Sequence, residues 1–305
     1  MALEFASLDR ADKASPCSVT IAPFLMKTAH KIAGARLIYR IVRAGRAMIG
    51  RTDRDVIVRG GIAYELDLSQ GIDFAIYLGN IYERQTRTAL SHLVAPSSLV
   101  LDIGANIGAH TLHLARLVGP GGRVIAFEPT DYAFRKLTRN IELNPQLGVR
   151  VVACHCFLAE HDDGRVPQAV YSSWPLTREP GLHAKHLGRE MRTEAARARS
   201  LDSMLVELAD RRVELVKLDV DGFECDVLKG APTLLRDVRP IFVMELSPYV
   251  LEEHGTSLDQ LLSYFIPNGY SLYDEKTRKP LPSTARELQR MIGDGASINA
   301  IARVD

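Results

Sequence analysis

From Leu99 onward, short apolar runs alternate with segments of helical periodicity, and this alternation restricts the fold more than any other feature of the chain. The apolar runs read SLVLDIG, RVIAFEP, VRVVACHCF, VELVKLDV and PIFVMEL, and YSLYDEK is a later candidate strand. Helical patterns end near Leu117 and cover residues 132–143, 223–235 and 257–265. Apolar strands separated by amphipathic helices form a mostly parallel sheet with helices on both faces. The sequence therefore predicts an α/β, Rossmann-like domain over residues 99–305.

The part of the chain before this domain is predicted to form an N-terminal helical extension and a connecting region. Residues 1–54 begin with a weakly patterned arm and continue into a basic amphipathic helix at 24–51. Residues 55–98 begin with alternating apolar and polar residues around a Gly-Gly pair, which predicts a hairpin. A second helix is expected at 82–94, leading into the Rossmann-like domain.

The basic helix at 24–51 has two interpretations. Leu37, Ile41, Ala44 and Met48 recur at helical spacing, while the polar side carries lysines and arginines and no acidic residue follows until Asp53. Such a helix can pack its apolar stripe on a core as a solvated lid, and we favour this interpretation. It can also lie on an anionic membrane or glycolipid surface as a peripheral contact.

Charge and cysteine content exclude several classes of partner. The sequence has 38 basic and 37 acidic side chains, a formal net charge of +1, so we expect no nucleic-acid partner. Its four cysteines match neither a disulfide framework nor a zinc pattern, and no resident metal is expected. The chain starts without a secretory signal pattern and has no apolar stretch long enough to cross a bilayer. We expect a cytoplasmic protein, and an oligomer remains open.

The segment VLDIGANIGAH carries the strongest local signal, a strand that ends at a glycine-containing turn and is followed by a helix. Gly104 and Gly108 allow the backbone to turn sharply and approach a ligand. The turn lacks the third glycine of a dinucleotide fingerprint, and Asp102 would repel a pyrophosphate. An acidic residue there suits the positively charged cofactor S-adenosylmethionine better than NAD.

Two further strands end in acidic residues that would meet at the same sheet edge. The strand in RVIAFEP ends in Glu128, where a carboxylate holds both ribose hydroxyls, one strand–helix–strand unit after Asp102. Asp219 and Asp221 follow VELVKL and would face the reacting groups, whereas Glu224 has the alternative of capping a helix.

These motifs, together with GNIYE before the first strand and SLD at 200–202, make the chain resemble the FkbM family of methyltransferases over residues 66–273. The resemblance implies a class I methyltransferase fold, S-adenosylmethionine as cofactor, and O-methylation of a hydroxyl on a sugar, glycolipid or secondary metabolite. By the same resemblance, the cofactor would be held by a larger set of residues: Asp102, Gly104, Asn106 and Gly108 in the loop, Glu128 at the ribose, Tyr82 and Glu83 over the methionine end, and Cys156 and Phe157 near the adenine.

Methyl transfer to an alcohol needs a group that takes the hydroxyl proton. Asp219 is the first choice for this catalytic base and His155 is the second. The acceptor would be bound by side chains at the same sheet edge or in the following insertion: Asp221, Glu224, Glu245 and Trp174. A divalent metal held by Asp219, Glu224 and Glu245 is a less favoured alternative.

Two other functions remain open. A nicotinamide-dependent oxidoreductase would use the same sheet and Glu128. A scaffold protein would keep a non-catalytic cofactor pocket and use the basic helix to engage a membrane or partner. The residues do not distinguish oxygen from nitrogen acceptors.

Overall fold

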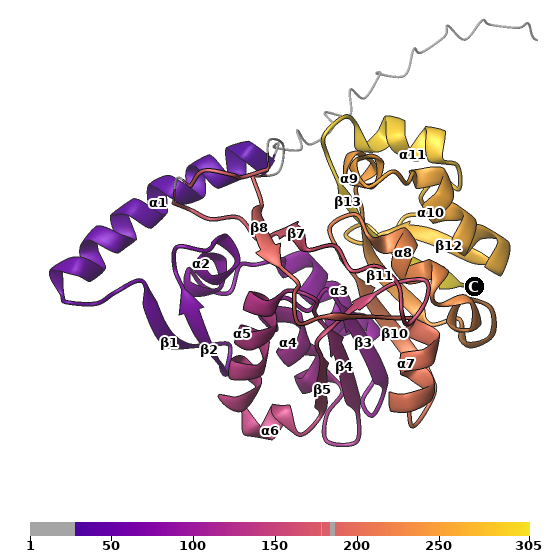
Figure 1. The fold of residues 1–305 in the computed structure, drawn as a ribbon, viewed down its shortest axis with the longest axis horizontal. Helices are drawn as coiled ribbons and strands as arrows, with labels where there is room; N and C mark the ends of the chain where they lie inside the picture. The colour runs from indigo at the N-terminus through magenta and orange to yellow at the C-terminus, as the bar shows by residue number, and fades with distance from the viewer. Residues whose placement is uncertain (1–27, 178, 184–186) are drawn as a thin grey trace, which may run out of the picture.

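The computed structural model describes residues 28–177, 179–183 and 187–305, with side chains from Gly34 onward. Its centre is a seven-stranded sheet in the order β12–β13–β11–β10–β3–β4–β5 (Figure 1). The strands are β3 (Leu99–Ile103), β4 (Arg123–Phe127), β5 (Val151–Cys154), β10 (Val213–Leu218), β11 (Ile241–Leu246), β12 (Tyr270–Asp274) and β13 (Ile298–Val304). Neighbouring strands are parallel except at β13, which runs antiparallel to β11 and β12.

Helices cover both faces of this sheet because the strands are apolar on both faces. In β3, Leu101 and Ile103 pack in one core cluster with α7, α8, α10 and α11, whereas Val100 packs in another with α3 and α4. The predicted α/β, Rossmann-like architecture is confirmed. The helices of the domain are α4 (Ala109–Leu117), α5 (Asp131–Glu142), α6 (Pro145–Gly148), α7 (Leu201–Leu208), α8 (Glu224–Lys229), α9 (Pro248–Glu253), α10 (Leu258–Phe265) and α11 (Ala285–Ile292), with a π-helical turn at Leu234–Val238 and a 3-10 turn at Ile266–Asn268.

The strand order determines where a ligand can bind. From β3 the chain moves outward to β4 and β5, and it later returns to β10 and β11 on the other side of β3. The order therefore reverses between β3 and β10. In open parallel sheets, ligands bind at the carboxyl ends of the strands beside such a reversal.

The connecting region contains the predicted hairpin. Strands β1 (Arg54–Arg59) and β2 (Ile62–Asp67) pair in antiparallel register around the Gly-Gly turn, followed by α2 (Gly71–Tyr77) and α3 (Arg84–Leu93). Asn140 of α5 docks the hairpin: its side-chain oxygen accepts from the Glu65 backbone at 2.7 Å, and its amide donates to the Ile107 carbonyl at 2.8 Å. The division of the chain at residues 54 and 98 remains a prediction.

Helix α1 (Thr28–Met48) confirms the helix predicted at 24–51, but its packing differs from the favoured lid. Tyr39 and Arg46 are the buried side chains, whereas Leu37, Ile41 and Met48 of the apolar stripe are exposed. Tyr39 is held by an edge contact with Phe74 of α2 and a hydrogen bond to Asp53, so tertiary contacts select a different helix face. The arm predicted at 1–22 lies outside the described residues.

Three local differences separate the structure from the predicted elements. The run VRVVACHCF divides at His155 into β5 of the central sheet and β6 (Cys156–Leu158), which pairs with β9 (Arg197–Arg199). The insertion after β6 contains the hairpin of β7 (Ala169–Ser172) and β8 (Arg189–Arg192). Strand β13 was not predicted.

Within the described residues, the helices are all too short or too polar to cross a bilayer.

Candidate active site

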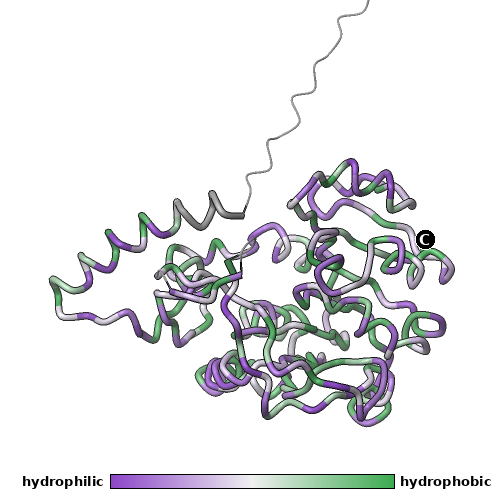
Figure 2. The backbone as a smooth tube through the Cα atoms, turned by 45° about the horizontal axis from the view of Figure 1, so that its top comes forward, coloured by the Kyte–Doolittle hydropathy of each residue, from purple (hydrophilic) through white to green (hydrophobic). Residues whose placement is uncertain are grey.

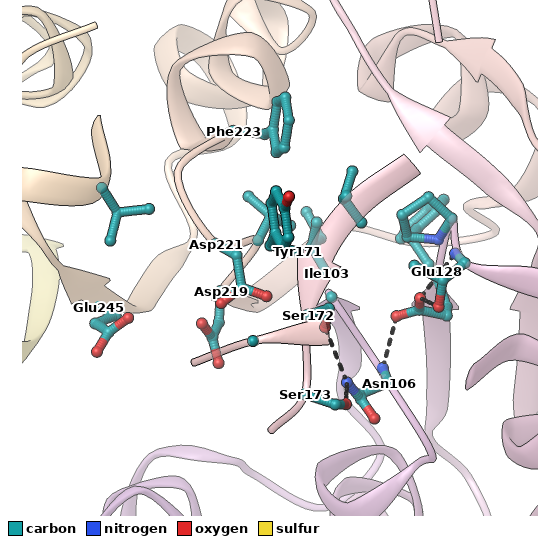
Figure 3. A pocket seen from close by; sticks show the side chains of 18 of the residues that line it. Ile103, Asn106, Glu128, Tyr171, Ser172, Ser173, Asp219, Asp221, Phe223 and Glu245 are labelled. Carbon is teal, nitrogen blue, oxygen red and sulfur yellow. Dashed lines mark hydrogen bonds between the residues drawn. The ribbon is translucent and has the colours of Figure 1, made fainter. Parts of the chain in front are cut away.

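A cavity opens at the carboxyl ends of β3, β4, β10 and β11, beside the reversal of strand order (Figure 3). Side chains from the connecting region, the sheet edge and the insertion between β6 and β9 share its wall. Most of the residues that the sequence assigns to a site line it: Tyr82, Glu83, Gly104, Asn106, Glu128, Cys156, Phe157, Trp174, Asp219, Asp221 and Glu245. The fold therefore brings together segments separated by more than a hundred residues, as expected for one binding site.

The glycine turn after β3 packs directly against the turn after β10. Gly104 has a φ of +79°, and a Cβ atom built on it would lie 1.8 Å from the carbonyl oxygen of Asp219. Asn106 has a φ of +48°, and its side-chain amide lies 3.4 Å and 3.3 Å from the hydroxyls of Ser172 and Ser173. Only glycine fits at 104, because any side chain there would separate the two turns.

Glu128 stands at the end of β4, buried beside the glycine turn. Its carboxylate accepts hydrogen bonds from the Asn106 backbone (2.8 Å), the Thr130 backbone (2.8 Å) and the Thr130 hydroxyl (2.5 Å). Burial raises the pKa of Glu128 although these donors stabilise the charged form. A carboxylate has about four acceptor positions, so the protein occupies most of them. Glu128 has room for about one ligand hydroxyl rather than the two that the sequence suggested.

Asp102 is not among the residues that line the cavity, so its predicted contact with the cofactor stays a prediction. Its side chain is completely buried and faces α4, where the Thr111 hydroxyl donates to it at 2.6 Å. Lys217 lies opposite it in the register of β3 and β10, with 3.9 Å between Nζ and Oδ1. Side chains alternate between the two faces of a strand, and Asp102 falls on the same face as Val100, which α3 and α4 cover. Asp102 therefore supports the cavity from behind.

Three more predicted site residues lie outside the cavity wall. Gly108 has a φ of +88° and precedes α4, so it serves the turn itself. His155, the residue between β5 and β6, stacks on Phe134 at 4.3 Å between ring centroids and is not among the residues that line the cavity, so its catalytic role stays a prediction. Glu224 folds back to the Val220 and Gly222 backbone amides at 3.3 Å, the capping alternative, and does not face an acceptor. Burial raises its pKa to about 7.

Asp219 is the most firmly held of the carboxylates at the acidic end of the cavity. Lys217 Nζ donates to its Oδ2 at 3.0 Å, and the lysine is nearly fully buried. Burial opposes the charge on Lys217, but Asp219 and the other nearby carboxylates outweigh it and raise the lysine pKa. A permanently charged lysine thus fixes the position of the Asp219 carboxylate.

Glu245 and Asp221 add two carboxyl groups that share the same space. Burial and the charge of Asp219 raise the pKa of Glu245 to about 8, although the Ser297 hydroxyl donates to it at 2.5 Å. Asp221 projects into the cavity and is the most open of the group (Figure 3). The surrounding protein and the charges of Asp219 and Glu245 raise its pKa well above the usual range. Near neutral pH the carboxyl groups at this end of the cavity are therefore partly protonated and partly ionised.

Glu83 joins Asp219, Asp221 and Glu245 as the fourth acidic residue at this end of the cavity, and it is charged. Its backbone adopts a left-handed conformation (φ +38°) just before α3, and its Oε2 lies 2.7 Å from His110 Nε2. Burial opposes ionisation, but the hydrogen bond and charge of His110, together with Lys217, outweigh it and lower the pKa of Glu83 to about 2. Tyr82 lines the cavity beside it, with its ring 5.8 Å from that of His110.

The opposite end of the cavity is apolar. Cys156, Phe157 and Leu158 of β6 are buried there, and Phe223 meets Phe157 edge to face at 5.1 Å. Burial raises the pKa of the Cys156 thiol to about 12, so this thiol is a packing group rather than a nucleophile. Among the residues described, no group of three or more metal-ligating side chains is placed to hold a metal ion.

Residues 102–272 match the family model of the methyltransferase FkbM domain. The match covers more than half of the chain and runs from the glycine turn through β12. The chain belongs to the FkbM methyltransferase family.

The curated relatives that the chain resembles include other methyltransferases. The FkbM methyltransferase described here is 31% identical over 170 residues to Methyltransferase 1 of Beauveria bassiana, covering 50% of this chain and 67% of the relative. It is 28% identical over 145 residues to the hexuronic acid methyltransferase AglP of Haloferax volcanii, covering 47% and 53% of the two chains. A crystal structure of a methyltransferase FkbM from Methylobacillus flagellatus KT aligns with a TM-score of 0.40 and 16% identity, covering 75% of this chain and 52% of that one.

Several wall residues of this FkbM methyltransferase escaped the sequence analysis. They lie at or near the ends of elements, or in a helix that was not predicted: Ser172 at the end of β7, Ser173 after it, Phe223 before α8, Tyr249 in α9 and Ser297 before β13. Trp174 was predicted, and it also anchors the insertion, since its ring fills the space that a side chain on Gly71 would occupy. In the sequence, the two serines at 172–173 stand immediately before Trp174, and this is the feature that could have predicted them as site residues.

Proposed function

We propose that this methyltransferase uses S-adenosylmethionine to methylate a hydroxyl group on an uncharged sugar, glycolipid or secondary metabolite. The observation that carries the proposal is the cavity at the strand reversal, which is apolar and aromatic at one end and lined by four carboxyl groups at the other. The family to which the chain belongs supports methyl transfer as the reaction. The chemistry of the wall supports the choice of donor and acceptor.

The residues of the cavity fit S-adenosylmethionine. Phe157 and Phe223 offer an apolar, aromatic space for an adenine ring, and Glu128 keeps about one acceptor position for a ribose hydroxyl. The charged carboxylate of Glu83 and the acids around Asp219 favour the positive charges of the amino and sulfonium groups. When bound, the cofactor supplies an electrophilic methyl group attached to a sulfonium.

Asp219 is the proposed catalytic base. An alcohol is a poor nucleophile at neutral pH, and its proton must be taken as the new bond forms. Lys217 holds one carboxylate oxygen of Asp219 at the cavity wall, which fixes the base without neutralising it by proton transfer. Glu245 and Asp221, both with raised pKa values, would orient the acceptor by hydrogen bonding.

The name of the Haloferax volcanii relative supports a sugar acceptor. The carboxyl groups in this cavity would repel a uronate, so we propose a neutral hydroxylated acceptor for this protein. The glycine turn with two glycines and the acidic wall argue against NAD and its pyrophosphate. We further propose a cytoplasmic site of action, consistent with the free thiols of Cys154, Cys156 and Cys225.

Calorimetric titration with S-adenosylmethionine, S-adenosylhomocysteine and NAD, with and without magnesium, tests the donor. We expect micromolar binding of the first two and no binding of NAD. NAD binding alone would contradict the proposal. Acceptors are then screened as neutral sugars, glycolipids and hydroxylated metabolites, with formation of S-adenosylhomocysteine as the readout and mass spectrometry to locate the methyl group. Methylation of amines alone would overturn the choice of oxygen.

Replacing the proposed base tests its role. Asp219→Asn should lower turnover at least about 100-fold, because the acceptor proton has no base, while S-adenosylhomocysteine binding changes little. Glu128→Ala should instead weaken that binding. Asp210→Asn, a substitution of an acid on the protein surface, is the matched control. Equal loss of binding in Asp219→Asn and Glu128→Ala would show that the two acids do not divide these tasks.

A further inference from the structure

Helix α1 exposes its most apolar surface. Leu37, Ile41 and Met48 are 62%, 66% and 84% exposed, and Ile38 beside them is 46% exposed. These residues recur at helical spacing and form one continuous stripe, which we call the α1 stripe. A single exposed leucine is ordinary, but a run of large apolar residues along one helix face marks an interaction surface.

The α1 stripe points away from the protein body. The core side of the helix is made by Tyr39, Val42 and Arg46. With 3.6 residues per turn, the centre of the stripe lies roughly 140° around the helix from that side. Figure 1 shows α1 along the edge of the molecule above α2, and Figure 2 shows hydrophobic and hydrophilic residues alternating along it. The described protein leaves the stripe uncovered.

Positive charge lies directly beside the α1 stripe. The chain has no acidic residue between Asp12 and Asp53, although the whole sequence has a net charge of only +1. Arg40 is exposed and has no ion-pair partner among the described side chains. Arg43 is 60% exposed even though its Nε lies 3.5 Å from Asp53. An apolar stripe bordered by solvated arginines is complementary to an anionic lipid surface.

We propose that α1 docks this protein onto an anionic lipid bilayer, with the α1 stripe at the acyl boundary and the neighbouring arginines at the lipid phosphates. The helix has 21 residues, so it would lie along the surface for about 30 Å. It is too polar to span the bilayer. When the helix lies in the membrane plane, its apolar side contacts the acyl chains and its arginines contact the lipid phosphates at the same time.

The core side of α1 connects the docking helix to the cavity wall. Arg36 of α1 donates to the Pro175 carbonyl at 3.3 Å, and the adjacent Trp174 lines the cavity. Tyr39 meets Phe74 of α2 at 5.7 Å, and Ile72 of the same helix also lines the cavity. The helix that would dock on the lipid therefore packs on two segments that carry cavity residues. The inference itself does not rest on methyl transfer, because docking is measured without cofactor.

Sedimentation with vesicles tests the proposal. The full chain is mixed with vesicles of equal parts phosphatidylglycerol and phosphatidylcholine, and with vesicles of phosphatidylcholine alone. We expect binding to the anionic vesicles and at least about tenfold weaker partitioning to the neutral ones. Absence of binding to the anionic vesicles, or equal binding to both, would overturn the proposal.

Matched variants identify the surface that binds. Ile41→Glu/Met48→Glu should lower partitioning at least about tenfold, since it places charges at the acyl boundary. Val149→Glu/Val206→Glu changes two apolar residues elsewhere that are at least as exposed (85% and 87%) and should bind like the wild type. Arg40→Gln should weaken partitioning about fivefold, whereas Arg290→Gln on α11 should not. All four positions of the glutamate variants are exposed, so unchanged melting temperatures are expected.

A second copy of the chain is the competing occupant of the α1 stripe. Sedimentation equilibrium at micromolar concentration distinguishes the two. If the wild type is a dimer that does not bind vesicles, and Ile41→Glu/Met48→Glu makes it a monomer, the stripe is an interface between copies and lipid docking is wrong. A wild type that binds anionic vesicles through the same residues supports the proposal.

Discussion

Gly104 has no side chain, and this allows the glycine turn to lie directly against Asp219 in the cavity wall. Its α-carbon approaches the Asp219 carbonyl so closely that a methyl group would overlap it. Asp219 is therefore held twice, through its backbone by Gly104 and through its side chain by Lys217. The proposed base and the glycine turn form one rigid unit.

Gly104→Ala should destabilise the fold and weaken cofactor binding together. The positive φ costs about 1–2 kcal/mol for alanine, and relieving the overlap with Asp219 adds about 1–3 kcal/mol. Gly119→Ala is the matched control, because Gly119 also has a positive φ (+66°) but open space around it. This variant should lose only the stability that the positive φ costs an alanine. Urea denaturation and titration with S-adenosylhomocysteine measure both effects. Equal destabilisation by the two substitutions would show that the contact with Asp219 is unimportant.

The sequence predicted which residues lie at the strand ends, but it predicted only for some of them whether the side chain points into the cavity. Asp219 and Asp221 follow the last strand residue and reach the cavity, as expected. Asp102 lies within β3, and alternation turns it toward α4. Because a parallel strand is apolar on both faces, the sequence carries no pattern that separates these faces. His155 follows the last residue of β5, as expected, but its ring stacks on Phe134, a direction that the sequence does not show.

At the scale of elements, α5 joins the β1–β2 hairpin to the central domain through its polar side. Asn140 of α5 and Asn144, which lies between α5 and α6, each accept from a backbone amide of β2, at 2.7 Å and 2.9 Å, and together they replace the strand partner that β2 lacks on that side. This docking places α2 and the segment around Tyr82 over the cavity.

Asn140→Ala should cost about 2–4 kcal/mol in the free energy of unfolding, because it leaves the Glu65 amide and the Ile107 carbonyl without partners. Arg135→Ala, on the exposed side of the same helix, should stay within about 0.5 kcal/mol of the wild type. Urea denaturation gives both values. A loss below about 1 kcal/mol for Asn140→Ala would mean that water replaces both hydrogen bonds.

The parallel strands and their helices were predictable because apolar runs of strand length stand out between amphipathic segments. Strand β13 was missed because INAIARV is interrupted by polar residues and has no helix after it to complete the pattern. The face of α1 that packs on the core was also mispredicted. Periodicity shows that a helix has an apolar side, whereas the burial of Tyr39 and Arg46 depends on partners distant in the fold.

At the scale of the whole molecule, a nearly neutral chain separates its charges. Acidic groups gather in the cavity, and basic groups gather on α1. Crowded carboxyl groups resist ionisation, so folding retains protons that the unfolded chain releases. The carboxyl groups with raised pKa values, Asp221, Glu224 and Glu245, therefore contribute stability that falls as pH rises, the opposite of Glu83, whose pKa is lowered by His110.

Glu245→Gln tests this pH dependence. The pKa of Glu245 rises from 4.5 to about 8 on folding, so the folded state binds the extra proton between these values and stability falls as pH rises through them. Glutamine does not ionise, and the variant should gain stability relative to the wild type by at most about 1.4 kcal/mol per pH unit. Urea denaturation at pH 5, 6.5 and 8 measures the difference. Glu214→Gln, at an exposed position of β10, should track the wild type, and parallel curves for Glu245→Gln would disprove the assignment.

The antiparallel insertion of β13 has a consequence for synthesis on the ribosome. Strand β12 leaves the exit tunnel before β13, yet it joins the sheet through β13, which lies between it and β11. Strand β12 must therefore wait for the residues that follow it, unlike strands that add to an existing edge as they emerge. Ser297, which completes the acidic wall at Glu245, arrives with the same late segment. A nascent chain acquires a finished binding cavity only after its sheet has closed around β13.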